Sequence, residues 1–155
     1  MIHYPDTSFL CSLYRKQEHT PCAIAFRATM IEPLHFTTLL EFEFLQAIEL
    51  QVWLHAQDQN KGCSRREAGQ MVTDWEADVA AGVNVLVPYE MEAVLRLARV
   101  YSGQHTGAGG HRTLDILHVA TAVHLRAKTF LSFDGRQRRL ADIAGLVMAP
   151  GAALP

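Results

Sequence analysis

The sequence predicts an α/β fold in which helices cover both faces of a parallel sheet. Short β-prone runs alternate along the chain with longer segments whose apolar residues recur at helical spacing. The 155 residues contain no internal repeat and no linker, and 49% of them are hydrophobic. That size and composition suit one domain with its own core, so we expect a single domain over residues 1–155.

The first strand is expected at residues 2–4, and a helix follows it through Tyr14. Asp6, Thr7 and Ser8 are all residue types that cap helix N-termini. Asp6 also follows the first strand directly, at the sheet edge where α/β folds place their ligands. Asp6 is therefore expected either to cap the helix, as Thr7 and Ser8 also could, or to point into the cleft, and both hold if Thr7 or Ser8 is the cap.

The next elements alternate in the same way. Residues 19–29 are expected to form the second helix, residues 33–38 the second strand, and residues 39–57 a long amphipathic helix. A capping box, Ser64-Arg65-Arg66-Glu67, opens a further helix that ends near Gly82.

The third strand is expected at residues 83–87, and residues 89–101 continue as a helix. The glycine-rich segment 103–111 is expected to be a flexible loop. It lacks the Gly-Lys-Ser/Thr ending of a phosphate-binding loop, so nucleotide binding of that kind is excluded.

The chain is organised around the stretch from Arg112 to Asp134, which begins as a helix and ends as a strand at residues 129–133. Asp115 lies in the first helical turn, where its charge suits the helix dipole, and Asp134 lies just past the strand. The remaining elements are a short helix at residues 136–143, a last strand at 146–148, and a frayed tail at 149–155.

Acidic residues recur where strands end or helices begin. Asp6 follows the first strand, Glu43 lies in the helix after the second strand, and Asp115 and Asp134 bound the central stretch. Two such charges about 4 Å apart repel by roughly 4 kcal/mol at an effective dielectric near 20. A hard divalent cation relieves this repulsion, and carboxylates with water suit Mg²⁺ or Mn²⁺ better than zinc.

Charge is unevenly distributed along the chain. Residues 1–92 hold 13 acids and 6 bases (net −7), whereas residues 93–155 hold 3 acids and 8 bases (net +5). A basic surface around a few carboxylates would attract a polyanion while keeping a metal, and the alternative is a chance distribution of charge on a solvated surface. The three cysteines show no CxxC pair and are expected to be free thiols. No apolar run is long enough for a membrane span and no signal peptide is evident, so we expect a cytoplasmic protein without membrane contact.

Four segments together resemble the PIN domain, and most closely the VapC-type toxins of toxin–antitoxin systems. They are Tyr4-Pro5-Asp6-Thr7-Ser8, Glu43–Ile48, Thr113–Ala122 and Phe130–Asp134, and they follow one another at fitting spacing over nearly the whole chain. The resemblance implies a three-layer α/β/α sandwich with a short parallel sheet, and Mg²⁺- or Mn²⁺-dependent cleavage of RNA. It also implies a homodimer and a small antitoxin partner.

The resemblance assigns metal binding and catalysis to Asp6, Glu43, Asp115 and Asp134. It gives Ser132, Thr7 and Ser8 supporting roles beside them. Glu41 is a rival to Glu43, but two residues separate them by about 200° around a helix, so only one can face the cleft. Within the resemblance, the pattern Glu-x-x-x-Ala-Ile favours Glu43.

Several basic residues flank the acids and are candidates for phosphate contact, with a solvated helix face as the alternative. These candidates are Arg112, Arg136, Arg138 and Arg139. His118 lies one helical turn after Asp115, where it would either pack in the core or reach the metal or a phosphate. The number of metal ions and the RNA target are not fixed by the sequence.

Two alternative functions remain. A small Mg²⁺-dependent phosphatase of the haloacid dehalogenase type also starts with a strand and an aspartate, but it needs a second aspartate two residues on, where this chain has Ser8. A catalytically inactive PIN-like protein would bind RNA or a partner without cleaving, and the presence of all four acids argues against it.

Overall fold

Short parallel strands alternate with helices along the chain in the computed structural model, which describes residues 1–151. The strands are β1 (His3–Pro5), β2 (Leu34–Phe36), β3 (Asn84–Leu86), β4 (Thr129–Leu131) and β5 (Val147–Ala149). The helices are α1 (Thr7–Tyr14), α2 (Thr20–Ala28), α3 (Thr38–Gln57), α4 (Arg65–Ala80), α5 (Met91–Tyr101), η1 (Ser102–Thr106), α6 (Gly107–Gly109), α7 (Thr113–His124) and α8 (Gly135–Ile143). The expected alternation of strands and helices is confirmed.

The strands form two hydrogen-bonded groups, β1-β4-β5 and β2-β3, and every pair within them is parallel. The two groups adjoin along β1 and β2, which pack next to each other. Here the backbone N–H of His3 donates to the ring Nδ1 of His35 (3.2 Å), a side-chain bond in place of a ladder bond. The central β1 and β4 therefore direct their C-terminal ends, followed by Asp6 and Ser132, to the same edge.

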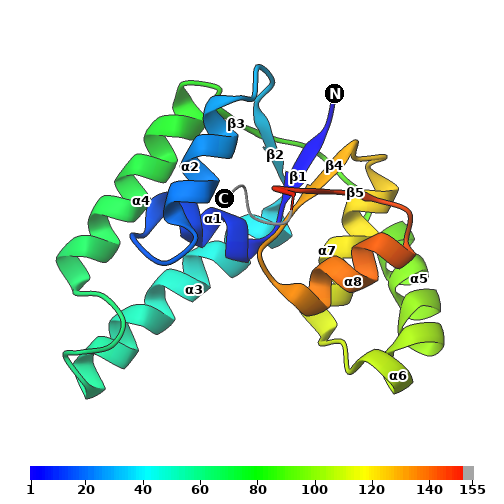
Figure 1. The fold of residues 1–155 in the computed structure, drawn as a ribbon. Coiled ribbons are helices and arrows are strands. Elements are labelled where there is room, and N and C mark those ends of the chain that lie inside the picture. The colour runs from blue at the N-terminus through cyan, green and yellow to red at the C-terminus, as the bar shows by residue number, and fades with distance from the viewer. Residues whose placement is uncertain (152–155) are drawn as a thin grey trace.

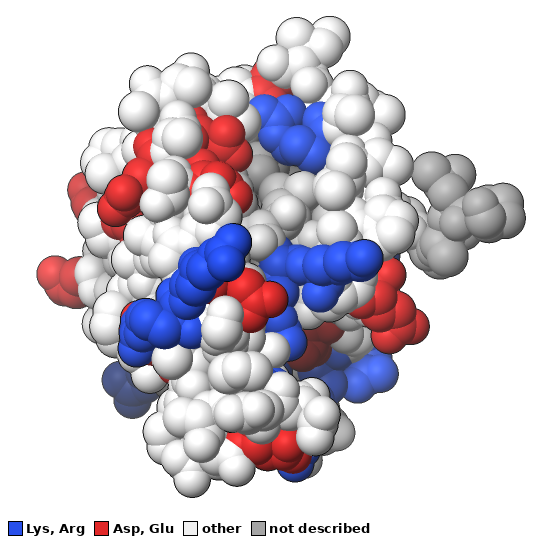
Figure 2. Space-filling model, turned by 90° about the vertical axis from the view of Figure 1, so that its left-hand side faces the viewer, with Lys and Arg blue, Asp and Glu red and all other residues white. Residues whose placement is uncertain are grey.

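Helices cover the strands on both sides. α1 to α4 gather on one side and α5, α7 and α8 on the other, with the strands between them (Figure 1). This arrangement is the expected three-layer α/β/α sandwich with a short parallel sheet. On the side that carries α3 and α4, acidic and basic side chains lie close together, so the net negative charge of the first half does not form a uniform acidic face (Figure 2).

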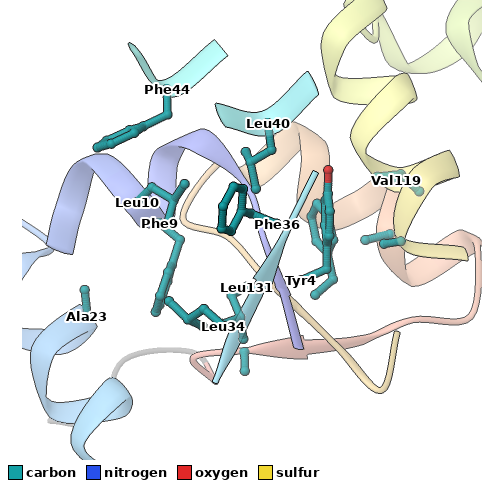
Figure 3. Packing of buried hydrophobic residues seen from close by; sticks show 14 of the residues in the cluster. Tyr4, Phe9, Leu10, Ala23, Leu34, Phe36, Leu40, Phe44, Val119 and Leu131 are labelled. Atoms are coloured by element: carbon teal, nitrogen blue, oxygen red, sulfur yellow. The ribbon is translucent and has the colours of Figure 1, made fainter. Parts of the chain in front are cut away.

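The core is built around aromatic side chains. Tyr4, Phe9, Phe36 and Phe44 are essentially inaccessible to solvent, and the Trp75 ring packs edge-on against Phe36 with centroids 4.8 Å apart. Side chains of this size bury about 150–250 Å² each and so dominate the hydrophobic stabilisation. Figure 3 shows the rings of Tyr4, Phe9, Phe36 and Phe44 among the strands and helices, with the Tyr4 hydroxyl directed away from the other labelled apolar side chains. The core thus fixes the strand ends on which the acids lie.

The prediction of a flexible loop at residues 103–111 is wrong. α5 continues without interruption into η1 and α6, and the helical run ends at Gly110, whose φ of +63° suits glycine. A Cβ on Gly109 would lie 2.4 Å from the His111 ring nitrogen Nε2, so the glycine leaves room for that buried ring. Here glycine serves close packing rather than chain flexibility.

The frayed tail was expected to start at residue 149, but the last strand extends to that residue. Ala149 is the last residue of β5 and accepts a hydrogen bond from Ser132 N (3.1 Å) through its carbonyl. Residues 152–155 of the expected tail lie outside the described residues. The capping box at Ser64 and Glu67 and the three free cysteines are as predicted. No helix within residues 1–151 combines the length and apolar character required to traverse a bilayer.

Candidate active site

Asp6 is buried at the C-terminal end of β1, with 1% of its surface exposed. Its Oδ1 accepts hydrogen bonds from Ser8 Oγ (2.7 Å) and Phe9 N (2.8 Å), and its Oδ2 accepts one from Ser132 Oγ (2.5 Å). Of the three residues expected as possible caps, Asp6 is therefore the one that caps α1, and Thr7 and Ser8 do not. Ser8 and Ser132 both donate to this carboxylate and so fix its orientation.

Burial raises the pKa of Asp6 from its usual range to about 6, although the hydrogen bonds from Ser132, Ser8 and Phe9 oppose the rise. A charged carboxylate that has lost its hydration is stabilised by any cation brought next to it. Asp6 thus carries an electrostatic cost at neutral pH that a bound cation would relieve.

Glu43 projects from α3 toward α7. Its Oε2 accepts hydrogen bonds from the Thr7 hydroxyl and from Nε2 of His118 (2.6 Å). Nδ1 of His118 is bonded to the Tyr4 hydroxyl (3.0 Å), and that hydroxyl also lies 3.2 Å from Thr37 Oγ1. Burial acts to raise the pKa of Glu43, but the bonds from His118 and Thr7 outweigh it and hold the pKa below its usual value.

His118 is therefore the packing residue that was one of the two expectations for it, and both of its ring nitrogens have hydrogen-bond partners. Its ring is 1% exposed and links the hydroxyl of Tyr4, on β1, to the carboxylate of Glu43, on α3. Sequence reasoning did not single out Tyr4. Its position could have indicated a role at the site, because it precedes Asp6 by two residues on β1.

Glu41 and Glu43 of α3 point in different directions, as the helical phase predicted. Oε1 of Glu41 accepts a hydrogen bond from the indole of buried Trp75 (3.2 Å), on the side of α4. Glu43 faces α7 and lines a pocket of about 320 Å³ together with Arg112 and Asp115. Glu43 is thus the glutamate on the side of the other acids.

Asp115 and Asp134 share one cation, the guanidinium of Arg112. Nε of Arg112 donates to Asp115 Oδ2 (3.0 Å), and Nη2 donates to both Asp115 Oδ1 (3.3 Å) and Asp134 Oδ2 (3.2 Å). The Asp115 side chain is 10% exposed and that of Asp134 27%, whereas the Arg112 side chain is 61% exposed. The start of α7 and the end of β4 thus meet at one positive group that can reach solvent.

Asp134 also caps α8, since its Oδ1 accepts hydrogen bonds from Arg136 N (2.8 Å) and Gln137 N (3.0 Å). Its own N–H donates to Ser132 Oγ (3.0 Å), the hydroxyl that donates to Asp6. A single serine therefore connects the two carboxylates that follow the neighbouring strands β1 and β4.

The four predicted acids form three hydrogen-bonded units rather than one cluster. Asp6 is held by serines, Glu43 by His118, and Asp115 and Asp134 by Arg112. Within residues 1–151, no group of three or more His, Cys, Asp or Glu side chains is arranged closely enough to hold a metal ion. The carboxylates that would form a metal site are thus hydrogen-bonded to other groups of the protein instead of gathered around one point.

The four arginines predicted to contact RNA differ in their surroundings. Arg136 and Arg139 are exposed on α8. Arg138 instead donates from Nη1 to the carbonyls of Ser132 (2.7 Å) and Pro150 (3.0 Å), so it holds the end of β4 against the chain after β5. Arg112 is engaged with two carboxylates. The structure therefore leaves Arg136 and Arg139 with the guanidinium groups most open to a ligand.

The chain matches the model of one protein family and is similar to several solved structures. The model of the PIN domain matches residues 3–143. VapC20 of Mycobacterium tuberculosis, described as a toxin that cleaves the sarcin-ricin loop, superposes with a TM-score of 0.65 at 16% identity and covers 94% of this chain and 96% of its own. FitAcB of Neisseria gonorrhoeae gives a TM-score of 0.62 at 15% identity, with 95% of this chain and 96% of that chain covered.

The structure of VapBC-1 of nontypeable Haemophilus influenzae is also similar to that of this chain. Its TM-score is 0.61 at 12% identity, and 96% of each chain is covered. A comparison with curated protein sequences gave no significant match. At these identities the structural likeness establishes the fold, while the match to the domain model covers nearly the whole chain.

Proposed function

This chain belongs to the PIN domain family, and on that premise we propose that it is a metal-dependent endoribonuclease of the VapC toxin type. The reaction proposed is hydrolysis of RNA phosphodiester bonds. The observation that carries the proposal is the position of Arg112, whose guanidinium lies between Asp115 and Asp134. Two carboxylates from separate elements are thereby already arranged around one cation at the edge where β1 and β4 end.

The donor set fits a hard divalent cation. Asp115 and Asp134 would hold Mg²⁺ or Mn²⁺ together with Asp6 and Glu43, since carboxylate oxygens are the ligands that these ions prefer. The raised pKa of buried Asp6 supports this assignment, because no cationic group among the described residues hydrogen-bonds to that carboxylate. When bound, such an ion would activate the attacking water and stabilise negative charge on the phosphate.

The surrounding residues keep the acids in place and ionised. Ser8 and Ser132 fix the rotamer of Asp6, and the Thr7 hydroxyl and His118 hold Glu43 in its charged form. The Tyr4 hydroxyl determines the orientation of the His118 ring. These bonds pre-organise the carboxylates, so that little reorganisation is required when a substrate arrives.

RNA would lie over the start of α8, next to Asp134. Arg136 and Arg139 are exposed beside Asp134 and are proposed to neutralise phosphates along the strand. Arg112 would join them once a metal ion replaces its guanidinium between the two acids. Arg138 is assigned a structural role, because both bonds of its Nη1 are made to backbone carbonyls.

The proposed partners follow the VapC type. The likeness to VapBC-1 and FitAcB supports a small antitoxin that binds and inhibits this chain, and we further propose a homodimer that acts in the cytoplasm. A gene for a small DNA-binding protein directly upstream would support the antitoxin. Co-expression of that protein should then relieve growth inhibition by this chain.

The direct test is RNA cleavage by the purified protein. Wild-type protein should cleave RNA in Mg²⁺ or Mn²⁺ and stop when EDTA is added, whereas Asp134→Asn should bind RNA with little turnover. Cleavage that persists in the chelator would contradict the proposal. A second candidate is a PIN-like protein that binds RNA or a partner without cleaving it, because Arg112 already neutralises Asp115 and Asp134. Binding without metal-dependent cleavage would select that candidate.

A further inference from the structure

A second pocket, of about 490 Å³, opens beside the acids between α1, the start of α2 and the end of β4. The residues of its lining that matter here are Ser8, Gln17, Glu18, His19, Phe133 and Asp134. It is continuous with the candidate active site. Asp134 belongs to both, and Ser8 Oγ donates to Asp6 and accepts a hydrogen bond from Phe133 N (2.9 Å).

One wall of this pocket is a stack of flat rings. The His19 imidazole lies on the Phe133 ring with centroids 4.6 Å apart and an interplanar angle of 7°. Phe133 in turn stacks on the fully buried Phe9 at 5.7 Å and 12°. His19 is exposed, so the stack is anchored in the core at one end and presents an aromatic face to solvent at the other.

His19 has no other evident structural task in this position. It precedes α2 as the cap residue, yet its side chain makes no capping hydrogen bond. The turn is held by other groups, because Gln17 N donates to Thr20 Oγ1 (2.9 Å) and Thr20 Oγ1 donates to the Arg15 carbonyl (2.8 Å). Within residues 1–151 the imidazole makes no hydrogen bond, and its stacking on Phe133 holds it at the pocket.

The polar groups of the pocket suit a base rather than a phosphate. No Lys or Arg is among the described residues that line it, and it contains the carboxylates of Glu18 and Asp134. Gln17 uses Nε2 as a donor to Ser12 Oγ (2.8 Å), which leaves its carbonyl oxygen as an acceptor. A planar, uncharged group with N–H donors on its edge matches these walls, and a nucleobase has that chemistry.

We propose that the pocket formed by His19, Phe133, Gln17 and Glu18 is a nucleobase subsite that takes an unstacked base next to the phosphate held at the acids. This inference rests on the proposed action on RNA and adds the means by which one base is positioned. The base stacks on the exposed face of His19, and the acceptors of Gln17 and Glu18 receive its N–H groups. Binding there is driven by stacking, so it differs in salt dependence from the contacts of Arg136.

The test uses octauridine carrying a single fluorescent 2-aminopurine, titrated with protein in EDTA so that no cleavage intervenes. Wild-type protein should quench the fluorophore, because stacking on an aromatic ring quenches it. His19→Ala should abolish the quenching and weaken binding by about 5- to 150-fold, the range for loss of one stacked base. His19→Phe should retain both, since it keeps a flat ring without the imidazole nitrogens.

The matched control is His105→Ala, because His105 also lies against an aromatic ring, that of Tyr101 (6.3 Å), but on η1, which follows α5. This variant should bind and quench like the wild type. Unchanged quenching and affinity in His19→Ala would overturn the subsite even if the wild type cleaves RNA. Quenching that depends on His19 would uphold it even if no cleavage is found, and a wild type that does not bind the oligonucleotide would overturn it.

Discussion

Replacing Asp6 by Asn should stabilise the metal-free protein at neutral pH and destabilise it in acid. Burial raises the pKa of Asp6 from 3.8 to about 6 in the folded state. A shift of about 2 units, at about 1.4 kcal/mol per unit, corresponds to roughly 3 kcal/mol of unfavourable free energy once the carboxylate is charged. Asn carries no charge and so escapes this cost.

The sign follows from the direction of the shift. Because the folded pKa lies above the unfolded one, the stability contribution of the protonated Asp6 is fully present below the unfolded pKa of 3.8. It is lost as the pH rises through about 6. The free energy of unfolding of the wild type should therefore fall across this window by roughly 3 kcal/mol more than that of Asp6→Asn.

The substitution also has a cost. The Asn carbonyl can still accept from Ser8 and Phe9, but its amide cannot accept from Ser132 Oγ as Asp6 Oδ2 does. Loss of one buried hydrogen bond costs about 1 kcal/mol. Asp6→Asn should thus be less stable than wild type by about 1 kcal/mol in acid and more stable by about 2 kcal/mol at neutral pH and above.

The assay is urea denaturation in EDTA, followed by circular dichroism at about pH 4 and about pH 8. Asp142→Asn is the matched control, since Asp142 is an exposed aspartate of α8 and its removal should leave the pH dependence unchanged. Comparison between variants at each pH cancels the titration of shared groups. If Asp6→Asn and wild type lose stability in parallel, the burial-based account of this carboxylate is refuted.

Further variants test the assignment of the acids and of the basic track. In single-turnover kinetics, Glu43→Gln should abolish cleavage while keeping the fold, and Glu41→Gln should cleave normally. In urea denaturation, Glu41→Gln should lose at most about 1 kcal/mol of stability, because its side chain accepts one hydrogen bond from the Trp75 indole. The reverse pattern would show that the wrong glutamate was assigned. Arg136→Ala and Arg139→Ala should each lower the slope of log affinity against log salt by about 0.7 for single-stranded RNA, and unaltered slopes would leave these arginines as a solvated surface.

Much of the fold follows from local pattern. Periodicity and turn residues predicted the order of strands and helices, and the capping box at Ser64 predicted a helix start. The segment 103–111 was mispredicted because glycine content was interpreted as flexibility. Whether Gly109 bends the chain or makes room for the His111 ring depends on packing, which composition does not contain.

The serines beside Asp6 were among the residues expected to support the acids, whereas the bonds of Glu43 to His118 and of Asp115 and Asp134 to Arg112 were not predicted. The helix phase of α3 was sufficient to choose Glu43 over Glu41. The spacing of Arg112 and Asp115 is that of an ion pair in the first turn of a helix, a signal that could have been used. Arg138, by contrast, bonds to the carbonyl of Pro150, twelve residues away, and only the packing of β4 beside β5 brings that carbonyl within reach.

The central claim is that the carboxylates bridged by Arg112 form the metal site. The most direct measurement is Mn²⁺ binding, followed by electron paramagnetic resonance of the free ion, for wild type, Arg112→Ala and the double variant Asp115→Asn/Asp134→Asn. Wild type should bind Mn²⁺, Arg112→Ala should bind it at least as tightly because no guanidinium competes, and the double variant should lose binding. Equal Mn²⁺ affinity in the double variant and the wild type would contradict the claim.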